Sequence, residues 1–195
     1  MKLLYLIPLS IILYACPYES SVGLEPGPVE AVDSSLLGYW YGIIKDGSDF
    51  FGIEALDISR QSDSLYAITR YGKTIRGDMI VPDTARFTGF TSRVNDQLFM
   101  TIQGSVLQVI TGKKKRPEVK TQKIFYLSNL QRRGDTLTVK TITDNFSPLA
   151  RKGFRYPGQL KIEISQLLEQ KKNIFDDTYS LSYRKMPRPT NLQTR

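Results

Sequence analysis

The stretch GDTLTVK at residues 134–140 begins at a turn-forming glycine and then alternates polar and apolar side chains. Successive side chains of a strand point to opposite faces, so Leu137 and Val139 fall on one face and Thr138 and Lys140 on the other. Such alternation is typical of a strand with one face against a core. The stretch therefore predicts one strand of an antiparallel sheet.

Similar short runs occur throughout residues 38–143, separated by turn signals such as Gly72-Lys73 and Pro82-Asp83. They predict strands at residues 38–45, 50–59, 65–71, 74–81, 85–91, 97–103, 106–111, 121–130 and 136–143. Many short strands at regular spacing are typical of a sandwich or an up-and-down barrel. The domain formed by residues 36–186 is therefore expected to be mainly β.

A helical period appears only after residue 159. Leu160, Ile164, Leu167 and Leu168 are spaced so that they form one apolar face of a helix. Residues 178–185 then predict a short last strand, and residues 187–195 predict a disordered tail. The expected fold is an all-β, antiparallel up-and-down barrel of about eight to nine strands, with one C-terminal α-helix and a short final strand.

This order of elements, together with Gly38-Tyr39-Trp40, resembles the lipocalins and related calycins, including lipocalin-like bacterial lipoproteins. The Gly-x-Trp motif matches the start of the first lipocalin strand. The resemblance implies that Trp40 plugs the closed base of the barrel and that an arginine from near the chain's end packs over it. Arg184 and Arg151 are the candidates for that arginine. A plain core tryptophan is the alternative interpretation of Trp40.

Residues 1–15 have the composition of a secretory signal peptide. Lys2 supplies the positive charge, and an apolar run follows from Leu3 to Leu13. The run is shorter than the roughly 20 residues that a membrane-spanning helix needs. We therefore expect a cleaved signal and not a transmembrane helix.

The signal ends in Leu13-Tyr14-Ala15-Cys16, which resembles the bacterial lipobox, with Tyr14 standing where a smaller residue is usual. The resemblance implies cleavage between Ala15 and Cys16 and a diacylglyceryl group on the Cys16 thiol. An ordinary secretory signal with a chance cysteine is the alternative. Residues 16–35 are rich in Pro, Gly, Ser and Glu, and predict a lipid-anchored flexible tether. The expected location is the bacterial cell envelope, with the outer membrane favoured and the face left open.

The composition restricts the chemistry. The chain has no histidine, and Cys16 is its single cysteine, so zinc sites built on His or Cys and Ser-His or Cys-His catalysis are excluded. The close carboxylate pairs of the sequence form no convincing acid–base pair, and we expect neither an enzyme nor a cofactor. Residues 113–195 carry 19 Lys/Arg and 7 Asp/Glu, a balance of +12. The signal peptide argues against nucleic acid as their partner.

A barrel of about eight strands is wide enough for one small ligand. The sequence offers aromatic candidates to line such a cavity: Phe51, Tyr66, Phe87, Phe99 and Tyr126. The alternative is that these rings only pack the core. The basic run Lys113-Lys114-Lys115-Arg116 predicts a hairpin loop that either contacts anionic lipid or an acidic partner, or is simply solvated.

We therefore expect a monomeric lipoprotein that binds a small apolar or amphipathic molecule. The alternative is a non-enzymatic accessory or scaffold subunit that binds another envelope protein.

Overall fold

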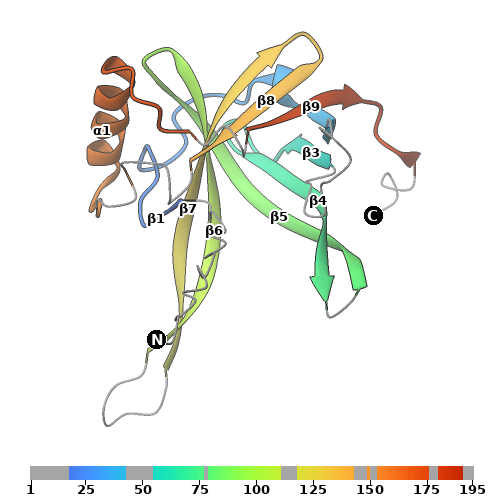
Figure 1. Cartoon of the computed structure of the whole chain (residues 1–195), viewed down its shortest axis with the longest axis horizontal. Coiled ribbons are helices and arrows are strands. Elements are labelled where there is room, and N and C mark those ends of the chain that lie inside the picture. Colours follow the sequence, from blue (N-terminus) through green and yellow to red (C-terminus); the bar gives the residue numbers. More distant parts are fainter. Residues whose placement is uncertain are drawn as a thin grey trace, which may run out of the picture.

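Eight antiparallel strands close into a barrel, as the sequence predicted (Figure 1). The computed structural model describes residues 18–42, 55–76, 79–110, 118–142, 149, 153–175 and 180–190. Around the barrel the strands are β2 (Gly38–Gly42), β3 (Ala55–Arg60), β4 (Tyr66–Arg76), β5 (Met79–Val94), β6 (Gln97–Ile110), β7 (Glu118–Arg133), β8 (Thr136–Thr141) and β9 (Ser180–Met186). β9 lies between β8 and β2 and closes the ring, and the extra strand β1 (Glu19–Ser20) pairs with β7.

Several strands are longer than the sequence predicted. Gly72-Lys73 and Pro82-Asp83, expected to be turns, lie inside β4 and β5 and pair with each other. The predicted strand at 74–81 is therefore wrong, and the predicted strands at 97–103 and 106–111 are one strand, β6. Pro82 is tolerated because β5 pairs only with β4 at this point, and proline is accepted where one edge of a strand has no ladder partner.

The barrel interior is an apolar core. Strand register brings Ile58, Ile68, Met100, Leu130 and Leu137 to one inward-facing cluster. Trp40 is fully buried in this cluster, together with Leu36 of the short 3-10 helix η1 (Ser34–Leu36). The Trp40 Nε1–H donates a hydrogen bond of 2.8 Å to the Leu36 carbonyl. This contact fixes η1 relative to the first barrel strand.

A second core lies between the outside of the barrel and helix α1 (Pro157–Glu169). The helix buries the predicted apolar positions Leu160, Ile164 and Leu167. They pack with Phe99, which is fully buried there and whose neighbours in β6, Leu98 and Met100, belong to the interior cluster. Because adjacent strand residues face opposite sides, Phe99 points outward toward the helix.

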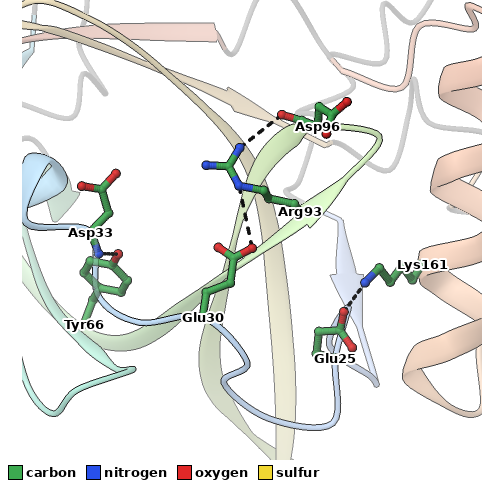
Figure 2. Close-up of polar contacts among 7 residues, drawn as sticks. All are labelled: Glu25, Glu30, Asp33, Tyr66, Arg93, Asp96 and Lys161. Atoms are coloured by element: carbon green, nitrogen blue, oxygen red, sulfur yellow. Dashed lines mark hydrogen bonds and ion pairs between the residues drawn. The ribbon is translucent and has the colours of Figure 1, made fainter.

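Residues 18–35 do not form the mobile tether that their composition predicted. Leu24 is fully buried in the core beneath α1, and the Asp33 backbone N–H donates to the Tyr66 hydroxyl at 2.7 Å. Figure 2 also shows Glu25 paired with Lys161 and Glu30 with Arg93. The prediction failed because a lack of periodicity excludes regular structure only. Isolated apolar residues in such a segment can still be buried.

Several predicted features lie outside the described residues: the signal peptide, Ala15 and Cys16 of the lipobox, and the basic run at 113–116. Within the described part of the chain, no helix has both the length and the apolar character needed to span a bilayer.

Candidate ligand cavity

A cavity of about 300 Å³ lies inside the barrel, among residues of the interior cluster. This volume is at the lower end of the range of about 300–1,000 Å³ that is usual for ligand pockets. The wall is predominantly apolar, and residues from seven strands form it: Leu56, Ile58, Ile68, Arg70, Phe87, Met100, Ile102, Tyr126, Ser128, Leu130, Leu137, Val139, Thr141 and Tyr183. The cavity therefore suits a small apolar group.

Arg70 is the charged residue of this wall. Its Nη2 donates to Asp83 Oδ2 at 2.6 Å, and both side chains are about one-third exposed, at 35% and 36%. The Arg70 Nε–H is buried and has no hydrogen-bond partner among the described residues. A buried, unsatisfied donor is costly, so this N–H favours a ligand that brings an acceptor oxygen.

Two tyrosine hydroxyls add polar character to the apolar wall. Burial raises the pKa of Tyr183, although the nearby Arg70 charge opposes the shift. Burial and the hydrogen bond to Glu19 raise the pKa of Tyr126, whose hydroxyl lies 3.1 Å from Glu19 Oε1. Both phenols are therefore neutral at physiological pH. The Tyr183 hydroxyl can donate or accept a hydrogen bond, whereas the Tyr126 O–H already donates to Glu19 and can only accept a further one.

The structure divides the five aromatic candidates. Phe87 and Tyr126 line the cavity. Tyr66 is fully buried in the interior cluster with Trp40 and does not line it. Phe99 was predicted wrongly, since it faces α1 on the outside of the barrel. Phe51 lies outside the described residues.

The base of the barrel differs from the predicted arrangement in one residue. Lys185, and not Arg184, covers Trp40, with its Nζ 5.2 Å from the indole centroid. In the β2–β9 ladder Lys185 is the partner of Trp40. Arg184 is the partner of Tyr41, so its side chain points to the opposite face of the sheet, where it is exposed. A cation over an indole ring contributes about 0.5–2 kcal/mol.

Gly38 leaves room for this lysine. Its φ of +130° is one that residues with a side chain rarely adopt, and a Cβ at this position would lie 2.9 Å from Lys185 Cε. The glycine of Gly38-Tyr39-Trp40 is thus favoured by its backbone conformation, whereas the contact with the flexible end of Lys185 could be relieved by a small shift of that side chain.

Sequence reasoning missed Arg70 and Tyr183. The alternation of Tyr66, Ile68 and Arg70 places all three on one face of a strand, and it is the signal that could have revealed the arginine. No comparable pattern marks Tyr183. Which of its side chains β9 turns toward the interior depends on its pairing with both β2 and β8.

Within the described ranges, no cluster of His, Cys, Asp or Glu is arranged to hold a metal ion. Comparisons of the chain with protein families, with curated proteins and with solved structures found no match.

Proposed function

We propose that this chain is a lipid-anchored lipoprotein of the cell envelope whose barrel binds or sequesters a small apolar or amphipathic molecule. The apolar cavity of about 300 Å³ inside the barrel carries the proposal. The binding is non-catalytic, and the ligand is held by burial of its apolar surface, worth about 25 cal/mol per Å² removed from water.

Polar groups around the cavity support an amphipathic ligand over a purely apolar one. The Arg70 Nε–H lacks a partner within the described structure, and Tyr183 belongs to the same wall. A few convergent polar groups in an otherwise apolar pocket are the usual means of fixing the orientation of a ligand.

Native mass spectrometry of the Cys16→Ser chain, exported by a bacterial host and purified without detergent, tests the ligand proposal. We expect an adduct of a few hundred daltons that is lost on denaturation, because an apolar pocket of this size retains a matching molecule. Residues 18–35 must be kept in the chain, since they are part of the folded core. A bare chain mass after export from the source bacterium itself would contradict the proposal.

Cys16→Ser also tests the lipid anchor. We expect the wild-type chain in the membrane fraction and the variant in the soluble fraction. The two acyl chains of a diacylglyceryl group anchor a protein stably, and the variant has no thiol to carry them. Fractionation of cells at high salt, followed by immunoblotting, measures the difference. A Ser10→Ala variant, changed within the signal peptide, is the matched control. Tight membrane attachment of a Cys16→Ser chain whose signal peptide has been removed would rule out the thioether anchor.

A second candidate, an accessory subunit that binds another envelope protein, is favoured by the β6–β7 hairpin. Residues 104–110 of β6 and 118–124 of β7 pair with each other and with no other strand of the described chain. Free strand edges can accept a strand from a partner. If only the bare chain is found by native mass spectrometry, this candidate takes precedence, and cross-linking in intact cells identifies the partner.

A further inference from the structure

The barrel wall is split between β5 and β6. Their pairing runs from Val94 opposite Gln97, next to the turn that joins them, to Thr88 opposite Gln103, where it ends. Beyond this point β5 continues with β4 alone and β6 continues with β7 alone. In Figure 1 the β4–β5 and β6–β7 hairpins diverge below this parting. The wall therefore has a lateral slot that starts at Phe87 and Gly104.

A hollow of about 640 Å³ with mixed polar and apolar walls lies at this slot. Its wall includes Gln61, Arg86, Thr88, Gln103, Ser105 and Lys123. Strand alternation places these strand residues on the outer surface, because their neighbours Phe87 and Ile102 line the cavity. The hollow is thus an outer feature, chemically distinct from the apolar interior.

Phe87 is common to the two walls, since it lines both the interior cavity and the outer hollow. Across the slot stands Gly104, and a Cβ there would lie 3.1 Å from the Tyr126 ring. Because residue 104 has no side chain, no side chain from this position fills the far side of the slot. The Phe87 ring is therefore the main side chain between the outer hollow and the apolar cavity.

The hollow carries uncompensated positive charge. Arg86 and Lys123 line it and are exposed, and neither forms an ion pair within the described part of the chain. No carboxylate belongs to its wall. Asp83, on the same strand as Arg86, is bound to Arg70 on the inner side. An anionic group would meet two cations and several neutral hydrogen-bonding side chains in this hollow.

We infer that the β5–β6 slot is a head-group site for a single-chain amphiphile with an anionic head. The head lies in the outer hollow against Arg86 and Lys123, and the chain passes Phe87 into the barrel cavity. This inference rests on the proposed function of the cavity, and it adds the charge of the ligand and its direction. It differs from the Arg70 contact considered above, because it places the head outside the barrel, where Arg86 and Lys123, and not Arg70, meet its charge.

Calorimetric titration of the full-length chain with two probes of equal chain length tests the site. Decyl phosphate carries an anionic head, and decanol is its neutral counterpart. We expect the wild-type chain to bind decyl phosphate about five- to tenfold more tightly, which is the scale of two partly exposed ion pairs. Arg86→Glu/Lys123→Glu should remove this preference and leave decanol binding unchanged. Arg86→Gln/Lys123→Gln should reduce the preference without introducing repulsion.

A charge-matched control is Arg133→Glu/Lys172→Glu, because both side chains are exposed and lie outside the hollow. This control should keep the preference for decyl phosphate. Retained preference in Arg86→Glu/Lys123→Glu would overturn the inference, as would a preference that only Arg70→Gln removes, since the head would then lie inside the barrel. Binding of decanol without any charge preference would overturn the head-group site alone. Binding of neither probe would overturn the cavity proposal with it.

Discussion

Replacing Trp40 with alanine is expected to lower the free energy of unfolding by about 3–5 kcal/mol, the usual cost of truncating a large buried aromatic residue. Trp40 is fully buried in the interior cluster of the barrel. The change would leave a cavity in this cluster, free the Leu36 carbonyl from its 2.8 Å hydrogen bond and remove the ring beneath Lys185. All three losses destabilise the folded state, so each of them lowers the free energy of unfolding.

Chemical denaturation of the wild type and the variant, followed by circular dichroism, measures this difference. Trp40→Phe is the graded control, because it keeps an aromatic ring but loses the Nε1–H donor, and it should cost less than alanine. Tyr156→Ala is the matched surface control. Its ring is 57% exposed, and a change of less than about 0.5 kcal/mol is expected. A Trp40→Ala effect as small as that of Tyr156→Ala would show that Trp40 is no structural plug.

The fold class could be predicted from the sequence because it depends on local patterns. Alternation in residues 134–140 predicted β8, and the spacing of Leu160, Ile164 and Leu167 predicted α1. The residues at which strands begin and end were harder to predict from the sequence. Pro82-Asp83 has the chemistry of a turn, yet it lies within β5, because the register with β4 and the free edge toward β6 override the local preference.

The candidate site could be predicted only in part, because it depends on register. Phe87 and Phe99 are both aromatic residues of strands, but one lines the cavity and the other packs against α1. A shift of one residue exchanges the two faces of a strand. The same one-residue difference explains why Lys185 covers Trp40 and the predicted Arg184 does not. Composition identified the kinds of side chain in the interior, and only pairing between distant strands decided which ones.

The segment at 18–35 illustrates a different limit. Its Pro, Gly and Ser content correctly excluded long helices and strands, but it could not indicate burial. Leu24 and Val32 are each buried by contacts with residues far away in the sequence. Such contacts leave no local period. Charge patterning was equally silent on the pairing of Glu25 with Lys161, whose partners are separated by most of the domain (Figure 2).

Ser128→Phe is expected to weaken ligand binding at least tenfold while preserving the fold. Ser128 lies in the cavity wall on β7, next to Met100 of β6 and Thr141 of β8 in the ladder. A phenyl ring at this position projects into an existing void of about 300 Å³ and not into packed atoms. Filling a void commonly stabilises a protein by about 0.5–2 kcal/mol. Affinity for an apolar chain should fall at least tenfold, because the ring occupies the volume that the chain needs.

Titration with decanol and thermal unfolding of the same preparation provide the two measurements. Ser128→Ala is the matched control, since it removes the hydroxyl without filling the void, and it should bind as the wild type does. If the ligand lies in the cavity, Ser128→Phe must lose affinity for decanol while its unfolding temperature stays unchanged or rises. If Ser128→Phe is stably folded and binds decanol normally, the ligand lies elsewhere. Lost binding with a lowered unfolding temperature would indicate distortion of the wall, and Thr141→Phe, on the neighbouring strand, would then separate the two causes. The cavity explains binding only if at least one of these two fillings blocks the ligand in a barrel as stable as the wild type.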